Sequence, residues 1–93
     1  MTDSIGSAWG GTRPSHFDRL LNLAWPDNAR GIPEAVEAIP VRVRMVWQYA
    51  GEQLEDGLAL AWTPSHVKIT TGSLTHRAGV TATWVAPHDV TRR

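Results

Sequence analysis

A strict alternation of apolar and polar side chains begins at Val41 and constrains this chain more than any other feature of its sequence. Every second residue is apolar in the run Val41, Val43, Met45 and Trp47. The residues between them place Arg42 and Arg44 on the opposite face. Side chains of a β-strand point alternately to its two faces, so a period of two is typical of a half-buried strand. We therefore predict a compact antiparallel β-structure from Val41 to Arg93.

Further strands are predicted after the first, because short alternating runs are separated by turn-forming residues. Glycine accompanies Glu, Asp or Ser at positions 50–52, 55–57 and 71–73, which predicts three turns. The predicted strands are residues 58–62, 66–70, 80–85 and 90–92, and an extension of the fourth strand over 74–77 is left open. In the run 58–62, we expect Leu58, Leu60 and Trp62 to continue the apolar face. Five short strands with small turns predict a small barrel or a strongly bent sheet.

The residues before Val41 follow different patterns. Residues 1–13 are small, polar and rich in glycine, which predicts a flexible tail. Residues 14–93 are predicted to form one domain, with a helical segment and linker over 14–40 and the β-structure over 41–93. A helix is predicted from Ser15 to Trp25, because apolar residues recur at helical spacing between a capping serine and Pro26. Those apolar residues are Phe17, Leu20, Leu21 and Ala24. A second, single-turn helix is predicted over Pro33 to Ala38.

The end of the chain, ATWVAPHDVTRR, resembles the end of a known class of small barrels. Src-homology-3-like barrels finish with a strand, a one-turn 3₁₀ helix and a closing strand, and an aromatic residue there precedes a small-Pro-polar-polar-Val stretch. The stretch from Trp84 to Val90 looks like that arrangement. The resemblance covers residues 41–93. It implies a mainly β fold, namely a small five-stranded antiparallel Src-homology-3-like barrel preceded by the short α segment.

Composition restricts the kinds of partner and environment. Nine basic and nine acidic residues cancel, which argues against a general binder of the phosphate backbone. The sequence contains no cysteine, so neither disulfides nor thiolate metal sites enter the fold, and we expect a cytoplasmic protein. No apolar stretch approaches the ~18 residues of a transmembrane helix, so no membrane span is predicted.

No catalytic or metal-binding motif is predicted. The four histidines, His16, His66, His76 and His88, have neither ligand-like spacing nor suitable neighbours, so we expect no metal and no cofactor. A triad drawn from Ser65, His66 or His88, and Asp89 lacks a nucleophile elbow, and sequence neighbours on a strand point to opposite faces. Glycines near the N-terminus do not form a phosphate-binding loop. We therefore expect a protein that is not an enzyme.

The candidate binding residues are arginines and aromatic side chains. Arg42 and Arg44 share one strand face, and Lys68 is a candidate to join them from a neighbouring strand. Five tryptophans are many for a chain of 93 residues; they serve either as core or as contact residues. We predict a partner-binding face made of Arg42, Arg44, Tyr49, Trp62 and Trp84, with Trp9 as an anchor in the tail. Strict alternation would put Trp62 and Trp84 inward, in which case this face shrinks to the other residues.

Two function classes follow from this face. The preferred hypothesis is a non-enzymatic protein-binding domain. The Trp-, Arg- and Ala-rich style resembles small accessory proteins of actinobacteria and their bacteriophages, which implies binding to a host protein such as a component of cell growth or division. The alternative is a nucleic-acid-binding small barrel that uses Arg42 and Arg44 with aromatic stacking. A homodimer also stays open, because a domain this small gains stability by associating.

Overall fold

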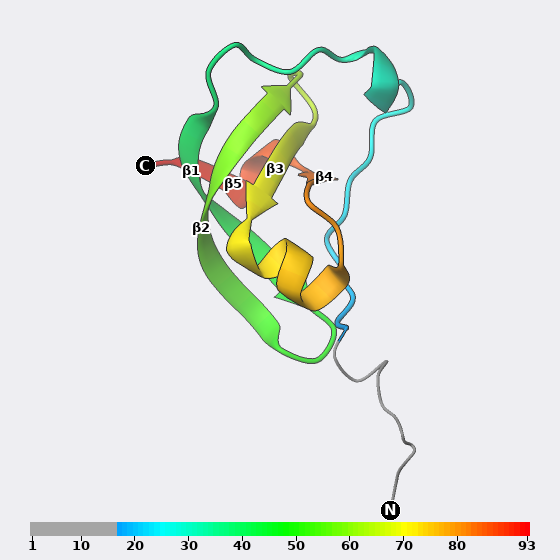
Figure 1. Cartoon of the computed structure of the whole chain (residues 1–93), viewed down its shortest axis with the longest axis vertical. Helices are drawn as coiled ribbons and strands as arrows, with labels where there is room; N and C mark the ends of the chain where they lie inside the picture. Colours follow the sequence, from blue (N-terminus) through cyan, green and yellow to red (C-terminus); the bar gives the residue numbers. More distant parts are fainter. Residues whose placement is uncertain (1–16) are drawn as a thin grey trace, which may run out of the picture.

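Five antiparallel strands form one open sheet in the computed structural model, which describes residues 17–93 (Figure 1). The sheet order is β4-β3-β2-β1-β5. The strands are β1 (Ile39–Trp47), β2 (Gly51–Trp62), β3 (Val67–Thr71), β4 (Thr83–Val85) and β5 (Val90–Arg92). Helical structure in these residues is limited to the 3₁₀ turns η2 (Ala29–Gly31) and η4 (Pro87–Asp89) and the π-helical turn η3 (Leu74–Ala78). The predicted tail and Ser15 lie outside the described residues.

The structure of β1 confirms the predicted alternation of inward and outward side chains. The inward residues Val41, Val43, Met45 and Trp47 are all buried and form the centre of the core. Strand β2 pairs with β1 along its first nine residues, from Gly51 opposite Trp47 to Ala59 opposite Ile39. The turn over 48–50 ends at Gly51, whose φ of +79° suits glycine because it has no Cβ. The β1–β2 hairpin therefore follows directly from local sequence.

Strand β2 continues through the turn that was predicted at 55–57. Gly57 instead marks a close approach between strands, since a Cβ there would overlap the carbonyl oxygen of Thr70. Glu55 contributes a half-buried carboxylate that accepts hydrogen bonds from Trp47 Nε1 at 2.9 Å, from Thr71 Oγ1 at 3.0 Å and from the Ser73 hydroxyl. This carboxylate links β1, β2 and the end of β3, so the polar residues there are strand residues with internal partners.

The pairing of β2 with β1 sets the facing of the second half of β2. Gly57 lies opposite Val41 and Ala59 lies opposite Ile39, so Ala59 is buried, whereas Leu58 is on the outer face and exposed. The expectation that Leu58 continues the inner face was therefore wrong.

The pairing of β2 with β3 then shifts between Ala59 and Ala61, which leaves Leu60 unpaired in the ladder. The shift places Trp62 opposite Val67. Trp62 is 44% exposed, but it lines a pocket together with the core residues Ala59 and Val67.

The helix predicted from Ser15 to Trp25 is not confirmed, because residues 17–25 run as an extended segment. Leu20 forms a β-bridge with Trp47 of β1, and Leu23 forms one with Val85 of β4. The segment 19–24 thus contacts the edge strand β4 and the part of β1 that β5 does not pair with, where unpaired backbone groups would otherwise need partners. The single-turn helix predicted over 33–38 is also not confirmed; the nearest helical turn is η2.

Asn22 replaces a strand partner at the edge of β1. Its side-chain Nδ2 donates to the carbonyl oxygen of Arg44 at 2.8 Å, and its Oδ1 accepts from the Val46 N–H at 2.9 Å. Leu21 N–H donates to the Val46 carbonyl, and Gln48 N–H donates to the Arg19 carbonyl. Beyond the short pairing with β5, the β1 edge is therefore satisfied by one side-chain amide and the backbone of the N-terminal segment.

Asp18 fixes the other end of this segment to the β1–β2 turn. Its carboxylate accepts hydrogen bonds at 2.9 Å from the backbone N–H groups of Arg19, Tyr49 and Ala50. Burial raises the pKa of Asp18, but these backbone donors and the nearby charge of Arg77 outweigh it and hold the pKa below its ordinary value. Asp18 is therefore a charged group with a structural role.

The end of the chain has the predicted order of strand, 3₁₀ turn and strand. Strand β4 is followed by η4, which begins at Pro87, and by β5, which pairs with residues 41–43 of β1. Residues 74–77, where a strand extension was left open, form the π-helical turn η3 instead. In the described part of the chain, no helix has the length and apolar character needed to cross a membrane.

Substitution of Asn22 by alanine tests whether one amide holds the β1 edge. Asn22→Ala leaves the Arg44 carbonyl and the Val46 N–H without their side-chain partners, so we expect a loss of about 1–3 kcal/mol in the free energy of unfolding, measured with urea. Asn28→Ala is the matched control, because Asn28 is exposed and makes no side-chain cap hydrogen bond. Equal stability of the two variants would contradict this role for Asn22.

Acid titration of stability tests Asp18. Because folding lowers the pKa of Asp18, its contribution to stability is present above the unfolded-state pKa of about 4 and is lost as the pH falls through the lower folded-state pKa. Asp18→Asn should therefore be less stable than wild type at pH 7, and the two should converge in acid. The exposed Glu37→Gln variant is the control for removal of one carboxylate. A constant difference between wild type and Asp18→Asn at all pH values would argue against the linkage.

Candidate functional site

Arg42 and Arg44 lie on the outward side of β1, as predicted, and they border a groove of about 480 Å³. The β5 strand lies beside them: Arg42 pairs with Thr91, whereas Arg92 pairs with the inward residue Val41 and so starts from the other face of the sheet. We call this feature the arginine groove; its lining residues are Arg42, Arg44, Leu54, His88, Asp89, Thr91, Arg92 and Arg93. The groove therefore joins strand β1 to residues 88–93 of the chain.

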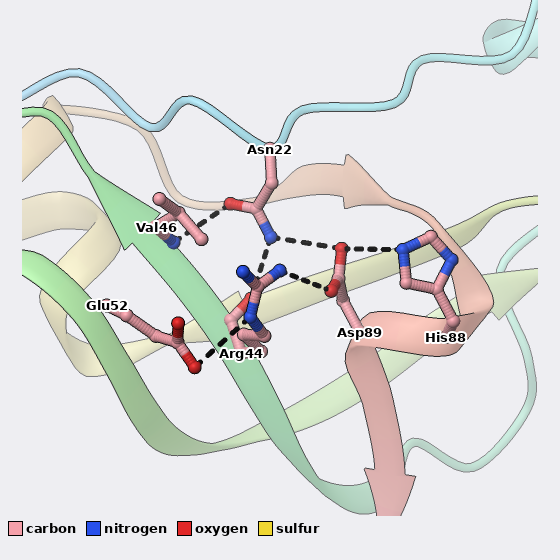
Figure 2. A network of polar contacts seen from close by, with 6 residues as sticks. All are labelled: Asn22, Arg44, Val46, Glu52, His88 and Asp89. Carbon is pink, nitrogen blue, oxygen red and sulfur yellow. Dashed lines mark hydrogen bonds and ion pairs between the residues drawn. The ribbon is translucent and has the colours of Figure 1, made fainter.

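Arg44 and Asp89 are the centre of a polar network at one end of this groove (Figure 2). Arg44 Nη1 lies 3.1 Å from Asp89 Oδ1, and Arg44 Nε lies 3.2 Å from Glu52 Oε2. Asn22 Nδ2 donates to Asp89 Oδ2 at 3.1 Å, and His88 Nε2 lies 3.7 Å from the same oxygen. The network therefore ties together the N-terminal segment, β1, β2 and η4.

The hydrogen bonds of this network favour the charged form of Arg44. Hydrogen bonds to Glu52 and then to Asp89 raise the pKa of Arg44 further above its ordinary value. The side chain of Asp89 is only 3% exposed, and both of its oxygens already have donors. A carboxylate held in this way has little access to a substrate, so the arrangement suits positioning of Arg44 more than acid–base chemistry.

The other arginines of the groove are less completely paired. Arg42 Nε donates to Asp56 Oδ1 at 3.2 Å, and Arg93 Nε lies 3.8 Å from the same oxygen. Arg93 Nε also donates to the Val41 carbonyl. Arg92 has no ion-pair partner among residues 17–93. One exposed carboxylate thus serves two guanidinium groups, and a third guanidinium has none.

The aromatic members of the predicted face are not gathered beside Arg42 and Arg44. Trp84 is 2% exposed, so it is a core residue. Trp62 is 44% exposed, but it lies at the far end of β2, whereas Tyr49 lies 77% exposed in the β1–β2 turn. Trp9 lies outside the described residues. The predicted face is therefore reduced at its centre to the two arginines.

Trp84 is buried on the side of β4 that faces away from the main core. Thr83 and Val85 share the inner side with their partners on β3, while Trp84 pairs with Lys68. Residues 24–35 cross this outer side: Ala24 N–H donates to the Trp84 carbonyl, and Ala35 N–H donates to the Leu60 carbonyl. Lys68, proposed from sequence as a third basic residue, instead pairs with Glu34 at 2.7 Å. The linker therefore covers the surface on which Trp84 was expected to bind.

Large apolar side chains gather at a second place that the sequence analysis did not identify. Five of them are each between 44% and 57% exposed, and we call them the apolar face: Phe17, Leu21, Leu23, Trp25 and Val80. Beside them lies a groove of about 400 Å³, lined largely by Leu20, Leu23, Trp25, Leu74, Val80 and Ala82. The apolar residues of 17–25 also alternate with Asp18, Asn22 and Ala24, which is the period of two of a strand. The same residues fit helical spacing, so the sequence analysis predicted a helix instead.

Among residues 17–93, the histidines and serines do not assemble a recognisable reactive centre. Ser65 Oγ lies 3.0 Å from His66 Nδ1 in the exposed turn between β2 and β3. Within residues 17–93, Asp89 contacts His88 rather than His66, so the triad considered from sequence is not assembled. No group of three or more His, Asp or Glu side chains with metal-site geometry occurs in the described part of the chain.

Comparisons with protein-family models, curated proteins and solved structures found no match for this chain.

The two tryptophans of the predicted face should differ sharply on substitution. Trp84→Ala removes a buried side chain, so we expect a loss of about 3–5 kcal/mol in the free energy of unfolding. Trp62→Ala removes a side chain that is nearly half in water and should cost clearly less. Urea unfolding of both variants provides the measurement. If Trp62→Ala proves the more damaging of the two, the assignment of Trp84 to the core is incorrect.

Proposed function

We propose that this domain is a non-enzymatic protein-binding module whose contact surface is the apolar face. The observation that carries the proposal is that four of the five outward-facing side chains in the extended segment 17–25 are large and apolar: Phe17, Leu21, Leu23 and Trp25. Single exposed apolar residues are ordinary on protein surfaces, whereas a contiguous group beside a groove is typical of a contact surface. Aromatic side chains are also enriched in the cores of protein interfaces.

The partner that suits this surface is a polypeptide segment with apolar side chains. The groove beside the apolar face offers mostly aliphatic and aromatic lining, with Asp18, Arg19 and Thr83 as its polar members. Of these, the Asp18 carboxylate is already used by backbone donors. Recognition would therefore depend on apolar burial, with Trp25 and Phe17 as the main anchors.

We also propose that the fold is of the Src-homology-3-like type. Support comes from the ending of β4, η4 and β5, and from the bridges by which Leu20 and Leu23 join β1 and β4. A closed or nearly closed sheet of this kind would present the N-terminal segment as a rigid surface. A host protein as the partner, and a phage-type origin, stay predictions that depend on the style of the sequence alone.

Charge insertion into the apolar face tests the proposed function. The Leu21→Glu, Trp25→Glu double variant should retain the fold, because both side chains are more than half exposed. Partners are first captured from the native host with the wild-type chain, and the purified partner is then titrated calorimetrically with each variant. We expect the dissociation constant to rise at least about tenfold, as for loss of interface hot spots.

Val36→Glu is the control for this experiment, since Val36 is fully exposed and lies outside the apolar face. It should bind the partner as wild type does. Unchanged affinity of the double variant, with a wild-type circular dichroism spectrum, would reject the apolar face as the contact surface.

A further inference from the structure

We infer that the arginine groove is a separate binding site that takes the carboxylate groups of an acidic peptide segment. The inference does not depend on the apolar face or on its partner. The groove is an open concavity of about 480 Å³, formed where β1, η4 and β5 meet. Its positions are set by backbone pairing of β1 with β5, so the arginines are held on a sheet and not on a loose loop.

The exposed guanidinium groups of the groove outnumber its exposed carboxylates. Arg42, Arg44 and Arg93 line the groove, and their carboxylate partners are at positions 52, 56 and 89. Asp89 is buried against Arg44 and Asn22, so two carboxylates face solvent beside three guanidinium groups.

Donors remain available for an added carboxylate. Among residues 17–93, the side-chain hydrogen bonds of Arg42 and Arg93 start at Nε, which leaves the outer edge of each guanidinium free of hydrogen bonds. Arg92 makes no ion pair within the same residues. A planar guanidinium binds a carboxylate through two parallel N–H donors, and exposed ion pairs such as Arg42–Asp56 contribute little net stability and exchange readily.

The groove suits a short acidic peptide better than a nucleic acid. Leu54 is 68% exposed and gives the groove an apolar surface on which the stem of a glutamate or a neighbouring side chain can pack. Phosphate-backbone binders need a longer basic stripe than this groove provides.

Peptide titration tests the inference directly. The probe is a fluorescein-labelled hexapeptide of glutamate and glycine with blocked ends, titrated with the full chain at 50 mM salt and followed by anisotropy. We expect saturable binding, shifts of the Arg42, Arg92 and Arg93 Nε–Hε resonances, and a severalfold loss of affinity at 200 mM salt. The corresponding glutamine peptide should bind at least tenfold more weakly.

Charge-matched variants locate the site. Arg42→Glu with Arg93→Glu should weaken binding of the glutamate peptide at least tenfold. The control pair, Arg19→Glu with Arg30→Glu, makes the same change in net charge at exposed positions outside the groove and should keep the wild-type affinity. The Leu21→Glu, Trp25→Glu variant should also bind the peptide normally, so a failed proposal for the apolar face would leave this result unaffected.

Three outcomes would overturn the inference. The first is equal binding of the glutamate and glutamine peptides, and the second is an equal loss of affinity in the groove pair and the control pair. The third is tighter binding of a 20-nucleotide single strand of DNA than of the peptide, with steep salt dependence, which would support the nucleic-acid hypothesis instead. Wild-type ¹H–¹⁵N spectra of each variant ensure that loss of binding reflects the groove and not unfolding.

Discussion

The fold of this domain depends on hydrogen bonds between the N-terminal segment and the free edge of β1. An open sheet has two edges whose backbone groups need partners. Here the Asn22 side-chain amide accepts and donates where a neighbouring peptide group would, on the part of β1 that β5 does not pair with, and the Asp18 carboxylate accepts from the N–H groups of the following turn. These contacts fix the N-terminal segment on the sheet.

The two candidate surfaces share this origin. Asn22 has its amide on β1 and also touches Asp89, so it holds Asp89 in place to pair with Arg44 in the arginine groove. The same extended backbone directs Leu21 and Leu23 outward, where they form the apolar face. Alternation within one short segment therefore sends Asp18, Leu20 and Asn22 toward the sheet, and it leaves several large apolar side chains exposed to solvent.

Local patterns predicted the parts of the fold that local forces determine. The alternation of β1, the turn before Gly51, and the ending with its 3₁₀ turn at Pro87 needed only neighbouring residues. The segment 17–25 was misread because its apolar spacing fits a helix as well as a strand, and its polar residues point inward to bond with the backbone. No sequence pattern shows that an asparagine will serve as a strand partner. The facing of Leu58 was mispredicted for a similar reason, since it depends on the register between β1 and β2.

The candidate sites were predicted in part. Arg42 and Arg44 lie together on one face because two residues on one strand always do. Their companions Asp89, Arg92 and Arg93 come from the end of the chain, and only the β1–β5 register brings them there. The exposed apolar residues escaped notice because a helical interpretation assigned them to a buried stripe. Both sites are therefore formed by contacts between segments that are distant in the sequence, and composition alone predicts neither site.

The position of the segment 19–24 also bears on how the protein stays in solution. Exposed strand edges are templates on which further chains can add, and this segment occupies the edge of β1 and the edge of β4 at the same time. A shortened chain that begins after residue 25 would keep all five strands but uncover both edges. It would then be prone to edge-to-edge aggregation. The segment 19–24 therefore protects the sheet from this kind of association, although it contributes no strand to it.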